Sequence, residues 1–158
     1  MTRAGTGDGT GERVVDVTGR VGYQLKRAQQ ALRAAMDAAL RQLEVTTPQY
    51  AALSALDASG PLSGAELARR SFVTPQTMNA ILVNLEQAGL VERRPHAEHG
   101  RVLETHLDPR GRALVRRAHT AVEAVEAQML TGLTRTERER LAGALRRCAD
   151  NLALATQA

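Results

Sequence analysis

The sequence predicts a mainly helical protein of the α+β class, with one small β-hairpin set between helices. Three observations lead to this fold class. Apolar residues recur every three or four positions over most of the 158 residues, which is the spacing of amphipathic helices. A Ser, Thr or Asp followed by proline, or by glutamate three residues later, opens most of these stretches. One stretch alternates with period two instead, as a β-strand does.

The composition limits the possible classes of protein. No apolar run approaches the roughly 20 residues that a bilayer-spanning helix needs, so we expect a cytoplasmic protein without membrane contact. The one cysteine, Cys148, excludes an internal disulfide framework. Aromatic residues make up only 2% of the chain, which argues against a platform that stacks single-stranded bases. The net charge of +4 permits a polyanion as partner but does not locate its site.

The first element is predicted to be a long helix. Residues 1–12 are rich in Gly and Thr and lack large apolar side chains, so we expect a flexible tail there. From Val14 to Leu43 apolar residues follow one helical stripe, which predicts about 30 helical residues and a length of roughly 45 Å. A small domain cannot cover so long a helix, and we therefore expect a second chain to cover part of it.

Two short helices are expected next. Thr47 and Pro48 supply an N-cap followed by a proline at the first helical position. Ser63 and Glu66 match the capping box, in which the Ser hydroxyl accepts from the third amide and the Glu carboxylate reaches back. The second of these helices should end near Arg70.

A third helix completes a helix–turn–helix. It opens at Thr74-Pro75 with the same combination of cap and proline, and it stops at Gly89. Its inward face is apolar and consists of Met78, Ile81, Leu82 and Leu85. A short helix, a four-residue turn and a longer helix form this arrangement, and both helices have the faces needed for mutual packing.

The pattern then changes to two strands. Leu90 to Arg94 and Arg101 to Leu107 are predicted to pair as a hairpin. The intervening residues 95–100 include a proline and a glycine and are too many for a tight turn, so the tip should project into solvent. A hairpin that projects beside a helix–turn–helix is a wing.

Two more helices complete the chain. One is capped by Asp108-Pro109, and Thr134 to Glu137 form a capping box for the other. We expect a winged lobe over 47–108 and a helical dimerisation region over 13–46 and 109–158. The core of an obligate homodimer should combine residues of the first and last helices, namely Val17, Val21, Leu25, Leu141, Leu145, Cys148 and Leu152.

Two motifs and the order of elements resemble the MarR family of bacterial transcriptional regulators. V-T-P-Q-T-M-N-A-I-L-V-N-L-E-Q-A-G-L-V-E-R-R-P, from Val73 to Pro95, looks like the family's recognition helix and first wing strand. H-G-R-V-L-E-T-H-L-D is similar to its wing signature D-x-R-x-x-x-L-x-L-T, with His99 and Asp108 in place of the Asp and Thr. The resemblance covers about Arg20 to Leu152. It implies a homodimeric repressor of the winged helix–turn–helix class that binds double-stranded DNA.

Candidate DNA contacts follow from groove geometry. The major groove admits one α-helix, whose N-terminal half approaches the base edges. Gln76, Thr77 and Asn79 lie on that half, and Gln or Asn can form two hydrogen bonds with adenine. Arg101 on the wing is a candidate for insertion into the minor groove. The other candidate contacts are Ser63, Thr74, Arg93, Arg94 and His99. Alternation along a strand puts only one of the two adjacent arginines on a given face.

Other readings are open to the same residues. Cys148 is in register with apolar residues, which predicts a small buried hydrophobe with an unreactive thiol, and a cysteine-based redox regulator is the alternative. Two of the four histidines lie in the wing loop and the others far along the chain, so we expect no metal and no cofactor. They are His96, His99, His106 and His119. No nucleophile with a base or phosphate-binding loop is visible, so no enzyme is expected. A winged helix used only for protein contact is the competing function.

The resemblance also implies an effector, because relatives commonly bind small aromatic acids or phenols between the dimer helices and the winged lobe. Candidate ligand contacts are Tyr23 and Arg27 on the first helix and Tyr50 on the second, which offer aromatic rings and a cation for a carboxylate. The alternative is that both tyrosines are ordinary residues at the edge of the core and that Arg27 is solvated.

Overall fold

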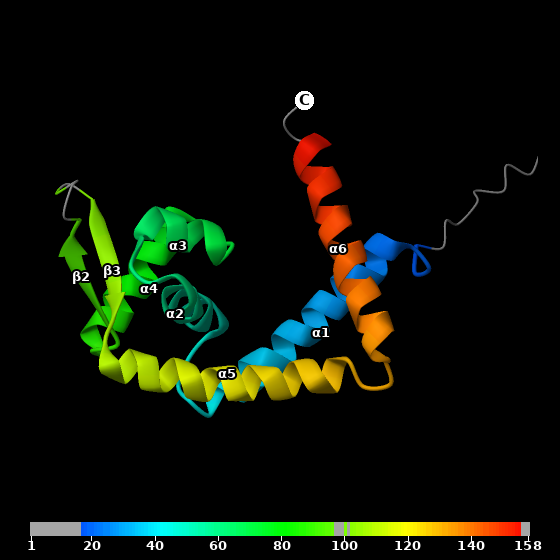
Figure 1. Ribbon diagram of the computed structural model, residues 1–158, viewed down its shortest axis with the longest axis horizontal. Helices are drawn as coiled ribbons and strands as arrows, with labels where there is room; N and C mark the ends of the chain where they lie inside the picture. The colour runs from blue at the N-terminus through cyan, green and yellow to red at the C-terminus, as the bar shows by residue number, and fades with distance from the viewer. Residues whose placement is uncertain (1–16, 97–99, 101, 156–158) are drawn as a thin grey trace, which may run out of the picture.

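The computed structural model describes residues 17–96, 100 and 102–155 (Figure 1). The elements in chain order are α1 (Val21–Arg41), α2 (Thr47–Ser59), β1 (Leu62–Ser63), α3 (Gly64–Arg70), α4 (Pro75–Gln87), β2 (Val91–Pro95), β3 (Leu103–Leu107), α5 (Pro109–Met129) and α6 (Arg135–Ala155). The predicted class, mainly helical with a small β-hairpin, is confirmed.

The helices and strands form a lobe and a helical extension. Figure 1 shows α2, α3, α4 and the strands gathered at one end of the molecule, while α6 rises from the far end of α5. Helix α5 contacts both α2 and α1 and so joins the two parts. In the described part of the chain, no helix is long and apolar enough to cross a membrane.

Most helix starts lie where the sequence places them. The side chains of Ser63, Thr74, Asp108 and Thr134 each accept a hydrogen bond from an amide two or three residues further on. The start of α2 is corrected by one residue. Its N-cap is Thr46, whose hydroxyl accepts from the Gln49 amide while the Gln49 side chain accepts from the Thr46 amide. Because Thr46 and Thr47 are adjacent, the sequence alone does not show which of them is the N-cap.

The first helix is shorter than expected. Helix α1 begins at Val21, and the residues before it form a turn in which the Arg20 amide donates to the Val17 carbonyl. Gly19 lies in this turn, and glycine favours turns over helix. The stripe that begins at Val14 therefore overstates the helix, which spans about 32 Å with 21 residues. The predicted tail at 1–12 lies outside the described residues.

The sheet has three antiparallel strands in the order β1-β3-β2. The wing strands pair as predicted, with Arg93 opposite Thr105 and Val91 opposite Leu107, although each strand begins one or two residues later. Strand β1 was not predicted; it has only two residues and pairs Leu62 with Thr105. Thr105 is thereby enclosed in the central strand and is almost fully buried.

The core lies inside the winged lobe, and α5 packs against it. Its buried residues come from α2, α3, α4, β1, β2 and α5 and include Leu53, Leu56, Leu67, Met78, Leu82, Leu85 and Val115. Gly111 allows α5 to approach closely, because a Cβ there would lie 2.0 Å from the carbonyl oxygen of Leu90. That oxygen also accepts from the Asp108 amide at 3.0 Å.

The helical extension leaves much apolar surface uncovered. None of the 21 residues of α6 is buried in the single chain. The exposed apolar residues of this region are Val17, Val21, Tyr23, Leu25, Met129, Leu141, Leu145, Leu152 and Leu154. Cys148 is exposed as well in the single chain, so its predicted burial depends on a second chain. The helical periodicity located the stripe correctly, but a stripe does not tell which chain covers it.

Candidate nucleic-acid interface

Helix α4 presents a polar face at its N-terminal half. Gln76, Thr77 and Asn79 are exposed, while Met78 is fully buried in the core, as the sequence predicts. The Thr74 hydroxyl fixes the start of the helix by accepting from the Thr77 amide at 3.1 Å. It also contacts the Thr77 hydroxyl at 2.9 Å. This local network holds the first turn, so the exposed side chains project from a defined backbone.

One hollow, of about 770 Å³, lies at the end of α1 and the start of α2, away from the exposed polar face of α4. A second hollow, of about 560 Å³, borders that face. The second is lined by residues of β1, α3, α4, β2 and the wing, namely Ser63, Gly64, Ala65, Asn79, Arg93, Val102, Leu103 and Thr105. It brings together three of the residues that the sequence selects as DNA contacts. The Ser63 hydroxyl is engaged locally, since it lies 3.0 Å from Glu66 Oε2 in the capping box.

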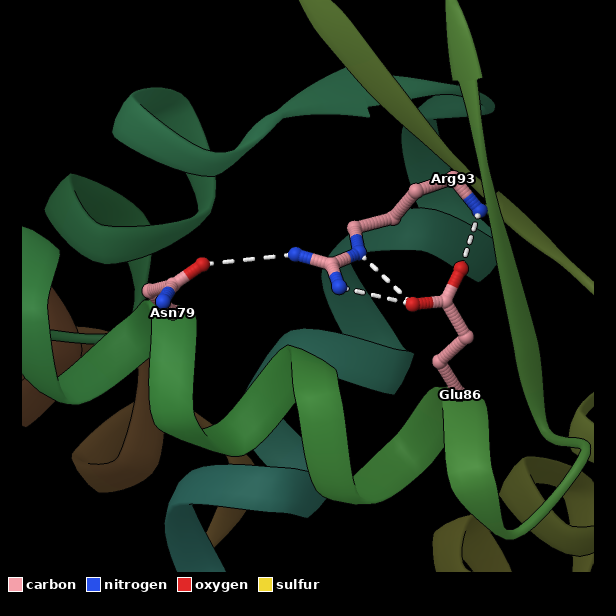
Figure 2. Close-up of polar contacts among 3 residues, drawn as sticks. All are labelled: Asn79, Glu86 and Arg93. Atoms are coloured by element: carbon pink, nitrogen blue, oxygen red, sulfur yellow. Dashed lines mark hydrogen bonds and ion pairs between the residues drawn. The ribbon is translucent and has the colours of Figure 1, made fainter.

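Arg93 links the wing to α4 (Figure 2). Glu86 on α4 accepts three hydrogen bonds from Arg93, from the backbone amide at 3.1 Å, Nε at 2.9 Å and Nη2 at 2.7 Å. The remaining guanidinium nitrogen, Nη1, donates to Asn79 Oδ1 at 3.3 Å. These bonds from Arg93 lower the pKa of the Glu86 carboxyl. Glu86 is therefore ionised at neutral pH, and its bonds to Arg93 hold β2 against α4.

Arg94 points to a different environment, as strand alternation predicts. Its Nη2 donates to Glu92 at 2.5 Å, and both side chains are exposed. This bond lowers the pKa of Glu92. The two adjacent arginines thus pair with different carboxylates, and Arg94 is the more exposed of them.

His96 and His106 lie around one carboxylate, that of Glu104. His96 Nε2 is 3.3 Å from Glu104 Oε1, and His106 Nε2 is 3.6 Å from Glu104 Oε2. Over residues 17–96, 100 and 102–155, no group of three or more His, Cys, Asp or Glu side chains is placed to hold a metal ion. His99 and Arg101, two of the predicted DNA contacts, lie outside the described residues.

The candidate ligand residues lie in different environments. Tyr50 lies at the contact of α2 with α5, where burial raises its pKa. Tyr23 and Arg27 are exposed on α1. A separate cleft of about 430 Å³ lies between α1 and the winged lobe, and none of the three residues lines it. Its lining includes Leu32, Arg33, Met36, Pro48, Ala51 and Phe72.

Phe72 beside this cleft is not among the residues predicted from the sequence. This side chain is 97% exposed in the turn before α4, and its backbone has a φ of 54°, a left-handed conformation that is unusual for an aromatic residue. No periodicity marks a turn residue of this kind. Its position beside the cleft became evident only from the fold.

The arrangement of α3, α4 and the paired strands defines a winged helix–turn–helix, the class of protein that places a helix in the major groove of DNA. The chain belongs to the MarR family. The sequence model of the MarR family matches residues 43–102. The HTH-type transcriptional repressor Rv2887 of Mycobacterium tuberculosis is 46% identical over 114 residues, which is 72% of this chain and 82% of that protein. The family consists of transcriptional regulators rather than enzymes, as the sequence predicts.

Solved structures agree with this assignment. The crystal structure of Rv2887 in complex with DNA has a TM-score of 0.68 and 40% identity, covering 81% of this chain and 96% of that one. The complex of Rv2887 with salicylic acid has a TM-score of 0.67 and 41% identity, covering 81% and 95%. The fold and the family predicted from the sequence are therefore confirmed.

Proposed function

We propose that this chain is a homodimeric repressor that reads a pseudo-palindromic operator and is released by a small aromatic acid or phenol. Residues 47–108 form the DNA-reading lobe in this proposal, and residues 13–46 and 109–158 form the dimer. The observation that carries it is the exposed polar face of α4 beside the hollow that contains Ser63, Asn79 and Arg93.

The DNA contacts divide by position on the lobe. Gln76 and Asn79 reach base edges from α4, with Thr77 beside them. Ser63, Thr74 and Arg94 lie around this helix and contact the DNA backbone. His99 as a further contact, and Arg101 as the residue that enters the minor groove, are proposed from the sequence. That the related Rv2887 has been solved with DNA supports this role for the shared lobe.

The uncovered apolar residues of α1 and α6 support the dimer. Helix α6 carries leucines at helical spacing, but none of its residues is buried in the single chain. Packing within that chain therefore adds little to the stability of the helix. A second copy of the same face would cover them on both chains. With two recognition helices related by a twofold axis, the operator should contain half-sites about 34 Å apart.

The cleft between α1 and the winged lobe supports an effector site. Leu32, Met36 and Pro48 give it apolar walls, and Arg33 supplies a cation suited to a carboxylate. The structure of Rv2887 has been solved with salicylic acid, an aromatic ring that carries a carboxylate. Tyr23, Arg27 and Tyr50 stay in the proposal as the alternative ligand contacts. A ligand at either place must bind the two dimer states differently in order to shift DNA affinity.

Selection from random double-stranded DNA tests the repressor. We expect recovery of one symmetric sequence, bound by a dimer with affinity that falls steeply with salt. Recovery of no symmetric site would contradict the proposal and favour the competing role in protein contact.

Calorimetric titration of the dimer with salicylate tests the effector site. Arg33→Ala should weaken binding if the cleft is the site, and Arg27→Ala should weaken it if the residues selected from the sequence are. Arg135→Ala is the control, because Arg135 is highly exposed on α6. Absence of saturable heat with salicylate and with other aromatic acids and phenols would remove the effector from the proposal.

A further inference from the structure

We propose that Arg93 is a positioning residue that fixes the carboxamide of Asn79, so that Asn79 offers its Nδ2 amino group to the DNA as a hydrogen-bond donor. The inference rests on the proposed function, because it assumes that the α4 face reads DNA. It replaces the expectation that Arg93 itself contacts DNA.

The geometry begins with helical spacing. Asn79 and Glu86 are two turns apart on α4 and therefore lie on the same side of the helix. The Arg93 side chain comes from β2 and spans the distance between them (Figure 2). Glu86 holds the guanidinium through Nε and Nη2, and its third bond fixes the Arg93 backbone amide. Nη1 is the one guanidinium nitrogen that does not bond Glu86, and it donates to Asn79 Oδ1.

The chemistry of the two side chains decides which atom of Asn79 faces the wing. A guanidinium has donors and no acceptor, so the carboxamide must turn its oxygen toward Arg93. Figure 2 shows Oδ1 directed at Nη1 and the carboxamide nitrogen directed away from it. Asn79 is exposed, so without this bond its carboxamide could adopt either orientation.

A fixed donor restricts the bases that Asn79 can read. In the major groove guanine presents the acceptors N7 and O6, thymine presents O4, and cytosine presents the N4 donor. The base contacted by Asn79 should therefore carry an acceptor, and cytosine should be rejected. Adenine presents the acceptor N7 and so also satisfies the Nδ2 donor, and the second lone pair of Oδ1, which Arg93 does not use, is the acceptor left for adenine N6.

Arg93 itself is poorly placed for a phosphate. Its side chain is 22% exposed, and two of its guanidinium nitrogens bond Glu86, whose negative charge offsets its own. A residue that neutralises no phosphate releases no counterion and leaves the salt dependence of binding unchanged. Positioning and phosphate contact therefore predict different measurements.

Competition binding with the selected operator and its single-base variants tests the inference. Lysine keeps a positive charge but lacks the planar fork needed to reach Glu86 and Asn79 together. Arg93→Lys should lower discrimination at the base pair read by Asn79 by about fivefold or more, with other positions and the slope of log affinity against log salt unchanged. Asn79→Asp presents an acceptor in place of the donor, so preference at the same base pair should move to cytosine. Arg135→Lys, which alters an Arg–Glu pair on α6, is the matched control.

The outcomes distinguish the positioning role of Arg93 from DNA binding by the dimer. If the wild-type dimer selects a symmetric site but Arg93→Lys keeps full discrimination, the positioning role is wrong and DNA binding stands. Arg93→Met, which removes the charge, should also leave the salt slope unchanged, and a slope reduced by about one would assign Arg93 to a phosphate. If the wild type selects no site, both proposals fail. Thermal unfolding checks each variant, and should Arg93→Lys unfold, Asn79→Asp decides the question, because it leaves Arg93 and Glu86 in place.

Discussion

The phenolic oxygen of Tyr50 lies 2.9 Å from Nδ1 of His119, across the contact between α2 and α5. The two rings meet edge to face, with centroids 5.6 Å apart and planes inclined by 82°. Nε2 of His119 is 3.7 Å from Asp57 Oδ2, so one imidazole contacts two residues of α2. The winged lobe is thus joined to α5 by a polar contact as well as by the core.

Tyr50→Phe should destabilise the protein by about 1 kcal/mol, because it removes the hydroxyl and leaves a part-buried imidazole nitrogen without its partner. Denaturant unfolding at neutral pH measures the change. Tyr23→Phe is the control, since Tyr23 is exposed on α1, and its effect should stay within about 0.5 kcal/mol. Equal effects of the two substitutions would mean that the Tyr50–His119 bond adds nothing to stability.

Gly111→Ala should be strongly destabilising, by about 3 kcal/mol or more, because the new methyl group meets the backbone oxygen of Leu90, which cannot move aside. The midpoint of urea unfolding gives the result. Gly64→Ala provides the comparison, since the nearest atom to its Cβ is Leu82 Cδ1 at 3.7 Å. That variant should be neutral or more stable by up to about 1 kcal/mol. A well-folded Gly111→Ala protein of normal stability would show that α5 does not approach Leu90 as described.

Glu86 should make stability depend on pH in the acidic range. Hydrogen bonds from Arg93 lower its folded-state pKa, so the folded protein holds the proton less readily than the unfolded chain. The contribution is fully present above the unfolded value of about 4.3 and disappears as pH falls through the lower folded value. Glu86→Gln should therefore be less stable than the wild type at neutral pH, with the difference shrinking in acid. A difference that stays constant with pH would contradict this linkage.

Leu145→Glu should convert the dimer to monomer, since it places a charge on the exposed apolar stripe of α6. Sedimentation equilibrium at micromolar concentration measures the assembly. Leu103→Glu is a matched control, because Leu103 is 47% exposed on the wing and Leu145 is 42% exposed. Only the α6 variant should dissociate. A wild-type protein that sediments as a folded monomer would refute the dimer itself.

The thiol of Cys148 should report on the same interface. It is exposed in the single chain and lies on α6 with Leu145, so a partner chain should cover it. We expect alkylation by iodoacetamide to be slow in the wild-type dimer and at least tenfold faster in Leu145→Glu. Equal rates in the two proteins would place Cys148 outside the interface.

The sequence predicted the starts of α3, α4, α5 and α6 and the inward face of α4, because those features depend on neighbours a few residues apart. A threonine before proline, or a serine three residues before glutamate, satisfies helical amides wherever the rest of the chain lies. Met78 was placed in the core for the same reason, since its neighbours on α4 give the helical period.

Other features depend on contacts between distant segments, and these were not predicted. The two residues of β1 are too few to show a period, and they become a strand only through pairing with β3. The turn at Gly19 is a local feature, and it was not predicted because the apolar stripe continues through it. Arg93 could be selected as a candidate from its position, but its bonds to Glu86 and Asn79 arise only when the wing folds back on α4.

The side-chain caps also bear on how the chain folds in time. Five helices begin with a cap whose partner is two or three residues away, so their first turns can form before any distant contact does. The sheet is different, because the pairing of Leu62 with Thr105 joins residues that lie far apart in the sequence, on either side of α3 and α4. Closing that long loop costs entropy which no local cap offsets. We therefore expect the folding rate to be limited by closure of the three-stranded sheet rather than by formation of the helices.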